Sequence, residues 1–196
     1  MNYLFGWNSI AEFILDELKD LGVGIQGVVI DDSYINNISL PTGIRVIASS
    51  KVVYRGDDSV INCLGYRDLH QRILIGEYLR ELGVLTSFVS KKASVHSSTH
   101  VGLGTVLVGD VVIERGCDIG RHSLFWGGSR VCHDSAIGQG VFLASGVIIG
   151  GGSKVGQACS FGFNSSMREK SSIPAGAKVG ANSFWRPGGE NVLCAE

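Results

Sequence analysis

The chain has 196 residues, of which 44% are hydrophobic and 18% charged, with a formal net charge of −1. This length suits one or two domains with a substantial core. The nearly neutral composition gives no support for a nucleic-acid-binding protein, and the apolar content disfavours a disordered one. Glycine is the unusual feature: there are 28, about twice the ordinary share.

Predicted strands and helices alternate over the first 88 residues. Ser9 and Glu12 form an S-x-x-E capping pattern ahead of a helix predicted over 10–21, and Gly22 follows that helix. A second helix is predicted over 68–82. The predicted strands lie at 2–5, 25–30, 45–48, 59–63 and 84–89. This alternation is typical of a small parallel α/β sheet.

A six-residue repeat replaces the helical period after residue 88. Every sixth residue from Val89 to Trp185 is large and apolar, and the residue four places after each, from Ala93 to Ser183, is small or compact. Because three such units complete one turn, residues 18 apart should stack, and the repeat predicts a parallel β-helix. The glycines that often follow the large residue are expected to permit unusual backbone angles at the bends. Antiparallel strands are disfavoured, because their period of two does not maintain a period of six.

Three segments carry a resemblance to a known family: LFGWNSIAEFILDEL from residue 4, VVIDDS from residue 28 and VCHDSAIG from residue 131. Together with the repeat, they make residues 2–185 similar to the NeuD/PglD sugar acetyltransferases of the hexapeptide-repeat family. The resemblance implies a Rossmann-like nucleotide-sugar-binding domain over 1–88. It also implies a left-handed β-helix acyltransferase domain, with a C-terminal tail, over 89–196.

The resemblance also implies an activity. The chain would be an N-acetyltransferase that takes acetyl-CoA as the donor. Its acceptor would be a 3- or 4-amino deoxysugar linked to UDP or dTDP, used for a surface glycan such as O-antigen. The enzyme would be a homotrimer with active sites between neighbouring β-helices.

The VCHDSAIG segment holds the predicted catalytic residues. By resemblance, His133 is the general base and Asp134 orients it; a neutral imidazole can accept the proton that the attacking amine loses. Gly151 lies 18 residues after His133, and its backbone N–H is predicted to bind the thioester oxygen. The family has a second histidine nine residues after the base, where this chain has Phe142, so the acetyl-CoA site departs from the family at Phe142.

The front domain is predicted to bind the nucleotide. A turn between a strand and a helix N-terminus suits a phosphate, and acids at a strand end suit a ribose hydroxyl or a nucleobase. Loops after other strands of such a sheet line the same ligand site. The predicted substrate-binding residues are therefore Gly6, Asn8, Ser9, Asp31, Asp32 and Gly65.

No metal is predicted. A spacing of 36 places His96 over Cys132, and a spacing of 18 places His100 over Asp118, so no three-histidine zinc set of the γ-carbonic anhydrase type forms in one chain. Five cysteines without a C-x-x-C pair indicate neither a disulfide framework nor a zinc ribbon. The start MNYLFGWNS has no basic region, and no run of 18 apolar residues occurs. These features predict a cytoplasmic protein without a membrane span.

Two alternatives stay open. An O-acetyltransferase acting on a sugar hydroxyl, such as that of sialic acid, would use the same base. A non-catalytic binding or scaffold protein would account for Phe142. It would also account for Asn8 and Ser9, which stand at or near the places where the family's turn has its second and third glycines.

Overall fold

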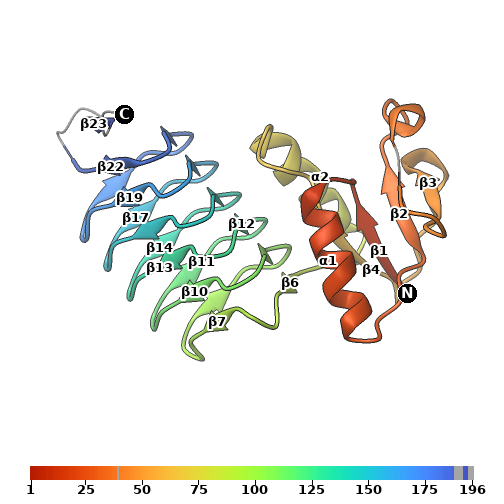
Figure 1. The fold of residues 1–196 in the computed structure, drawn as a ribbon, viewed down its shortest axis with the longest axis horizontal. Helices are drawn as coiled ribbons and strands as arrows, with labels where there is room; N and C mark the ends of the chain where they lie inside the picture. The colour runs from red at the N-terminus through yellow and green to blue at the C-terminus, as the bar shows by residue number, and fades with distance from the viewer. Residues whose placement is uncertain (39, 188–191, 194–196) are drawn as a thin grey trace.

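The computed structural model describes residues 1–38, 40–187 and 192–193. An α/β sheet at the N-terminal end lies beside a stack of short-stranded coils (Figure 1). Most of the tail after Trp185 lies outside the described residues. Within the described residues, no helix combines the length and the apolar character needed to cross a membrane.

The first part of the chain forms a five-stranded parallel sheet in the order β3-β2-β1-β4-β5. Leu4 of β1 packs in one apolar cluster with residues of α1, whereas the next residue, Phe5, packs in another cluster with Leu79 of α2. Because successive strand residues point to opposite faces, the two helices cover opposite faces of the sheet. The elements are β1 (Asn2–Phe5), α1 (Ser9–Asp20), β2 (Gly27–Ile30), η1 (Ile35–Asn37), β3 (Val46–Ala48), η2 (Ser49–Lys51), β4 (Ser59–Asn62), α2 (Leu69–Glu81) and β5 (Leu85–Thr86).

The cap of α1 differs from the predicted one. Asn8, not Ser9, is the N-cap: its side-chain oxygen accepts from Ile10 N at 2.9 Å and Ala11 N at 3.4 Å. The Asn8 amide also donates to Cys63 O at 2.7 Å. Asparagine prevails here because its side chain both caps the helix and ties it to the end of β4.

The strand predicted over 84–89 is divided in two. β5 pairs with β4 in the α/β sheet, whereas β6 (Phe88–Val89) pairs with β9 (Val106–Leu107) of the stacked coils. The chain changes sheets at Ser87, whose side chain accepts from Gly104 N at 2.9 Å. The apolar residues therefore read as one strand in the sequence, although the two halves pair with different sheets.

Residues 88–185 form a parallel β-helix with three sheets. Strands one coil apart pair in register, as Ile113 with Val131 and Val131 with Ile149 show. The predicted stacking at 18 residues is confirmed, while the left hand stays a prediction of the resemblance. The first sheet contains β6, β9, β12 (Leu124–Phe125), β15 (Phe142–Leu143), β18 (Ser160–Phe161) and β21 (Lys178–Val179). The second contains β7 (Ser94–Val95), β10 (Val112–Ile113), β13 (Arg130–Val131), β16 (Ile148–Ile149), β19 (Ser166–Met167), β22 (Ser183–Trp185) and the antiparallel β23 (Val192–Leu193). The third contains β8 (His100–Val101), β11 (Asp118–Ile119), β14 (Ala136–Ile137), β17 (Lys154–Val155) and β20 (Ser172–Ile173).

The predicted inward columns form the core of the β-helix. Every sixth residue from Leu107 to Val179 is at most 4% exposed. Val89, the first of the series, is 48% exposed because it lies at the open end of the stack. The small column is also buried from Thr105 to Ser171, including Cys117 and Cys159.

The glycines after the large residues serve a purpose other than the predicted one. None of them has a positive φ; the left-handed position is the third residue after most of the large ones, such as Asp134 with a φ of 58°. A Cβ at Gly102 would lie 2.5 Å from the backbone nitrogen of Arg121 in the next coil. These glycines allow the coils to approach closely.

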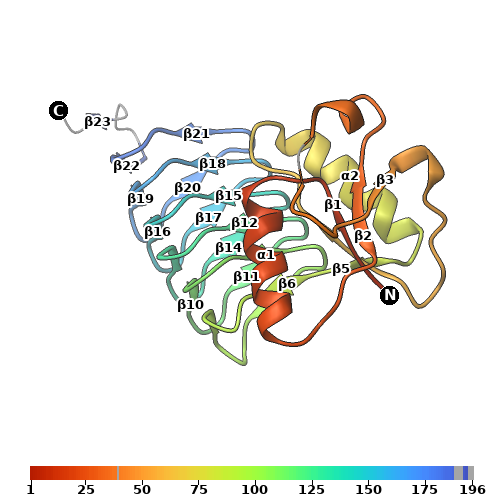
Figure 2. The ribbon, with the colours of Figure 1, turned by 45° about the vertical axis from the view of Figure 1, so that its right-hand side comes forward.

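Both helices contact the β-helix. Figure 2 shows α1 beside the first coils, where Glu17 accepts from Ser90 Oγ at 3.2 Å. On α2, Glu77 Oε1 accepts from His122 Nε2 and Gln139 Nε2, both at 3.0 Å, and pairs with Arg121 at 3.2 Å. Burial raises the pKa of Glu77, but the hydrogen bond from His122 and the positive charges around it outweigh burial and lower the pKa to about 2.

This cluster predicts an acid-sensitive junction. Because the pKa of Glu77 falls from 4.5 to about 2 on folding, its stabilisation is complete above about pH 4.5 and disappears as the pH falls towards 2. Thermal unfolding scans over this range should show that the Tm of wild type falls more steeply than that of Glu77→Gln. Glu81→Gln removes an exposed carboxylate from the same helix and should keep the wild-type slope. Equal slopes for wild type and Glu77→Gln would contradict the prediction.

Candidate functional site

His133 and Asp134 lie on one corner of the β-helix, in the turn that follows β13. We call the turns after β7, β10, β13, β16 and β19 the histidine corner; they comprise residues 96–99, 114–117, 132–135, 150–153 and 168–171. Each turn lies above the previous one because its flanking strands pair in register. The repeat therefore projects the second and third side chains of each turn out of the core, while the fourth points inward.

The His133 ring is held by Asp134. Its Nδ1 lies 3.0 Å from Asp134 Oδ2, and both side chains are about half exposed. The hydrogen bond with His133 is the main cause that lowers the pKa of Asp134, and the charge of Arg115 adds to it. Since Asp134 is ionised at neutral pH, we assign the ring proton to Nδ1, which leaves the lone pair of Nε2 free to accept a proton.

Two glycines make room for this pair. Asp134 Oδ1 occupies the place that a side chain of Gly116, one coil below, would take. A Cβ at Gly151, one coil above, would lie 2.8 Å from His133 Nε2. The basic nitrogen of His133 therefore lies against the backbone of Gly151.

Gly151 also offers a hydrogen-bond donor. The hydrogen bonds of the described residues include no acceptor for its N–H. The neighbouring Gly152 N, in contrast, donates to His133 O at 2.8 Å. A free N–H next to a basic imidazole nitrogen is an arrangement that can bind the oxygen of a reacting carbonyl. The structure thus brings three predicted residues together: His133, Asp134 and Gly151.

Glu114 and Arg115 were missed by sequence reasoning. Glu114 Oε2 accepts from His133 N at 3.0 Å, and Arg115 Nη2 lies 3.5 Å from Asp134 Oδ2. They precede His133 by 19 and 18 residues, so the 18-residue stacking, applied backwards from His133, would have found them.

Phe142 lies on a different sheet of the β-helix from the strand that precedes His133. It begins β15 in the first sheet, is 5% exposed, and stacks under Tyr66 with ring centroids 4.4 Å apart. His133 follows a strand of the second sheet. The two residues therefore belong to different faces of one β-helix.

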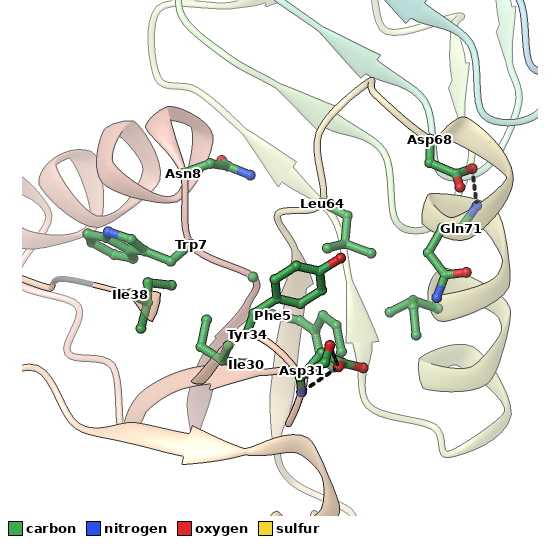
Figure 3. Close-up of a pocket in the computed structure, with 13 residues that line it drawn as sticks. Phe5, Trp7, Asn8, Ile30, Asp31, Tyr34, Ile38, Leu64, Asp68 and Gln71 are labelled. Atoms are coloured by element: carbon green, nitrogen blue, oxygen red, sulfur yellow. Dashed lines mark hydrogen bonds between the residues drawn. The ribbon is translucent and has the colours of Figure 1, made fainter. Parts of the chain in front are cut away.

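A cavity of about 590 Å³ lies at the strand ends of the α/β sheet (Figure 3). Of the predicted substrate-binding residues, Gly6, Asn8 and Asp31 line it. Trp7 and Tyr34 also line it; they are aromatic residues that sequence reasoning did not select. The sequence did contain a signal for them, because Trp7 lies in the turn after β1 and Tyr34 in the loop after β2.

A second cavity, also of about 590 Å³, continues from the first. Both include Asn8 and Tyr34, so they form one groove, and the second adds the predicted residues Ser9 and Gly65. It reaches Trp126, in the turn that follows β12 of the β-helix.

Asp32 lines neither cavity. Its carboxylate accepts from the side chains of Ser49 and Ser50 and from the backbone N–H of Ser50 at 3.0 Å. The two hydrogen bonds from Ser50 are the main reasons that its pKa is lowered. Of the paired acids, Asp31 faces the groove and Asp32 fixes the loop after β3.

The described residues contain no group of three or more histidine, cysteine or acidic side chains that could hold a metal ion. The stacking of His100 on Asp118 that the spacing predicted is present, with Nδ1 2.8 Å from Oδ1. His122 faces α2 and Glu77, on another corner from His133.

Solved structures share this fold. The acetyltransferase domain of PglB from Neisseria gonorrhoeae superposes with a TM-score of 0.83 at 18% identity, over 94% of this chain and 90% of that chain. Its complex with acetyl coenzyme A gives a TM-score of 0.79 at 19% identity, over 92% and 87%. A mutant of GDP-perosamine N-acetyl transferase from Caulobacter crescentus, in complex with CoA and GDP-perosamine, gives 0.81 at 20% identity, over 94% and 88%. No protein-family model matches the sequence, and no curated protein matches it significantly.

Proposed function

We propose that the chain is an acetyl-CoA-dependent N-acetyltransferase that acts on a nucleotide-linked amino sugar. The observation that carries this proposal is the His133–Asp134 pair, whose free Nε2 lies against Gly151, a residue with an N–H for which the described residues provide no acceptor. Acyl transfer needs both a base for the nucleophile and a donor for the oxyanion. The fold shared with an acetyltransferase domain bound to acetyl coenzyme A supports the choice of donor.

Each group has one task in the reaction. The amine attacks the thioester carbonyl carbon, and His133 Nε2 takes the proton that the amine loses. Asp134 holds the imidazole and stabilises the positive charge that forms on it. The Gly151 N–H donates to the carbonyl oxygen as it becomes negative. The C–S bond then breaks, the thiolate takes the proton from the imidazolium, and the products are an amide and CoA.

The groove of the α/β part suits a nucleotide-linked acceptor. We propose residues 1–88 as the nucleotide-sugar domain and residues 89–196 as the acyltransferase domain. Trp7 and Tyr34 offer aromatic surfaces for a nucleobase, and Asp31 offers an acceptor for a ribose hydroxyl. Arg67, in the second cavity, offers a cation for the diphosphate. The fold shared with a structure that contains GDP-perosamine supports an acceptor of this class.

We propose that assembly of several chains brings the acetyl-CoA site at His133 and the nucleotide-sugar groove together. The groove reaches the turn after β12, whereas His133 lies in the turn after β13, on the next corner of the β-helix. We therefore propose a homotrimer in which the histidine corner of one chain faces the groove of its neighbour. The free Cys63, Cys117, Cys132 and Cys159 fit the proposed cytoplasmic location.

The test is CoA release measured with acetyl-CoA and 3- or 4-amino deoxysugars linked to UDP, dTDP or GDP. We expect release with at least one of them and an acetamido product by mass spectrometry. Release only with a sugar hydroxyl would replace this function by O-acetylation. Acetyl-CoA binding without release from any acceptor would favour a binding or scaffold protein.

A further inference from the structure

The histidine corner contains a backbone N–H that the β-helix ladder leaves free. In the turn of His133, the first residue donates to the coil above, Cys132 N to Ile149 O at 3.0 Å, and the third donates to the coil below, Asp134 N to Arg115 O at 2.9 Å. The second residue lies between these two and has no ladder partner. At the second positions of the other turns, the hydrogen bonds of the described residues include no acceptor for the N–H groups of Ser97, Arg115, Gly151 and Glu169.

His133 is the exception at this corner, because its N–H donates to Glu114 Oε2 at 3.0 Å. Glu114 stands in the turn one coil below, where its own N–H donates to Val131 O at 2.9 Å. Its other oxygen, Oε1, pairs with Arg130 Nη1 at 3.0 Å. The carboxylate therefore bridges the Arg130 guanidinium and the main chain of His133.

The charge of Glu114 strengthens this bridge. Its pKa is lowered, first by the hydrogen bond from His133 N and then by the one from Arg130, while burial acts in the opposite direction. An ionised acceptor makes a shorter and stronger hydrogen bond than a neutral one. Asp134 thus holds the ring of His133, and Glu114 holds its main chain from a different coil.

We propose that Glu114, held by Arg130, is a positioning residue that fixes His133 over Gly151. The effect on rate rests on the proposed function, whereas the anchoring itself does not. Glu114 Oε2 contacts the backbone of His133 rather than its ring, so it acts on the reaction only through His133.

A second carboxylate provides a control that distinguishes positioning of His133 from ordinary structural support. Asp110 Oδ1 accepts from Gly128 N, in the turn one coil above, at 2.9 Å. This is the same kind of bond on another corner, with no histidine attached. Asp110→Ala is therefore the matched control for Glu114→Ala.

The first measurement does not depend on activity. Amide hydrogen exchange by NMR should show slower exchange at His133 than at Arg115 or Gly151. The protection should disappear in Glu114→Ala and persist in Glu114→Gln, which keeps an acceptor oxygen. The ring signals of His133 should broaden in Glu114→Ala alone. Unchanged exchange and unchanged ring signals in a folded Glu114→Ala would overturn the proposal, whether or not any acceptor is acetylated.

The second measurement is kinetic. Glu114→Ala should lower kcat about tenfold or more, since small displacements of a catalytic group carry penalties of that order, with KM for acetyl-CoA unchanged. Glu114→Gln should recover most of kcat, and Asp110→Ala should keep the wild-type value at a similar Tm loss. In a His133→Ala background, Glu114→Ala should cause no further loss. An equal loss in both backgrounds would overturn the proposal, whereas no turnover by wild type would instead refute the proposed function.

Discussion

His133→Ala should reduce CoA release by about 10²- to 10⁴-fold, the usual contribution of a general base. In the proposed mechanism the attacking amine would then have to lose its proton to water, while the Gly151 N–H would still bind the thioester oxygen. Binding of acetyl-CoA, measured by calorimetry, should therefore stay close to wild type. The thermal unfolding midpoint should also stay close, because His133 is about half exposed.

The chain provides a matched control for this substitution. His100 and Asp118 form a second exposed histidine–carboxylate pair, with Nδ1 2.8 Å from Oδ1, on the strands of the third sheet. It reproduces the His133–Asp134 contact, but the residue 18 positions after His100 is Asp118 rather than a glycine. His100→Ala should keep CoA release within about twofold of wild type. If His133→Ala retained more than a tenth of the wild-type rate, or if His100→Ala lost as much, His133 would not be the base.

The β-helix could be predicted in detail because its period is encoded by residue size. One large and one compact residue in every six specify the inward columns, and the column from Leu107 to Val179 is buried as expected. The same pattern says nothing about which turn residue has a positive φ. That position accepts Asp134 and His122 as well as glycine, so composition did not reveal it.

The candidate site was likewise only partly predictable from the sequence. The motif and the 18-residue stacking led to His133, Asp134 and Gly151, which the fold places together. Glu114 lies within reach of the same arithmetic. The contacts of α2 with the β-helix could not be predicted in this way. Glu77 and His122, which are 45 residues apart in the sequence, contact each other because two differently built parts pack together, and no repeat encodes that packing.

Arg72 is another fully buried residue at this junction. It is 0% exposed. Nε donates to His122 O at 2.8 Å, and Nη1 donates to Asn62 O at 3.0 Å and to Leu64 O at 2.5 Å. Nη2 lies 3.5 Å from the carbonyl oxygens of Gly104 and Ser123. Burial lowers the pKa of Arg72 to about 10, so the side chain is charged at neutral pH and is stabilised by carbonyl dipoles from both parts of the chain.

Arg72→Ala should therefore be among the most destabilising single substitutions in this protein. It leaves several buried carbonyl groups without donors and opens a cavity between α2 and the β-helix, which together cost about 3–5 kcal/mol. For a chain of this size, the loss corresponds to a Tm about 10 °C lower. Arg72→Met fills the space without donors and should recover only part of it. Arg121→Ala removes a half-exposed arginine with one ion pair at the same junction and should cost about 1 kcal/mol or less. A Tm for Arg72→Ala as close to wild type as that of Arg121→Ala would mean that the two parts of the chain do not depend on this arginine.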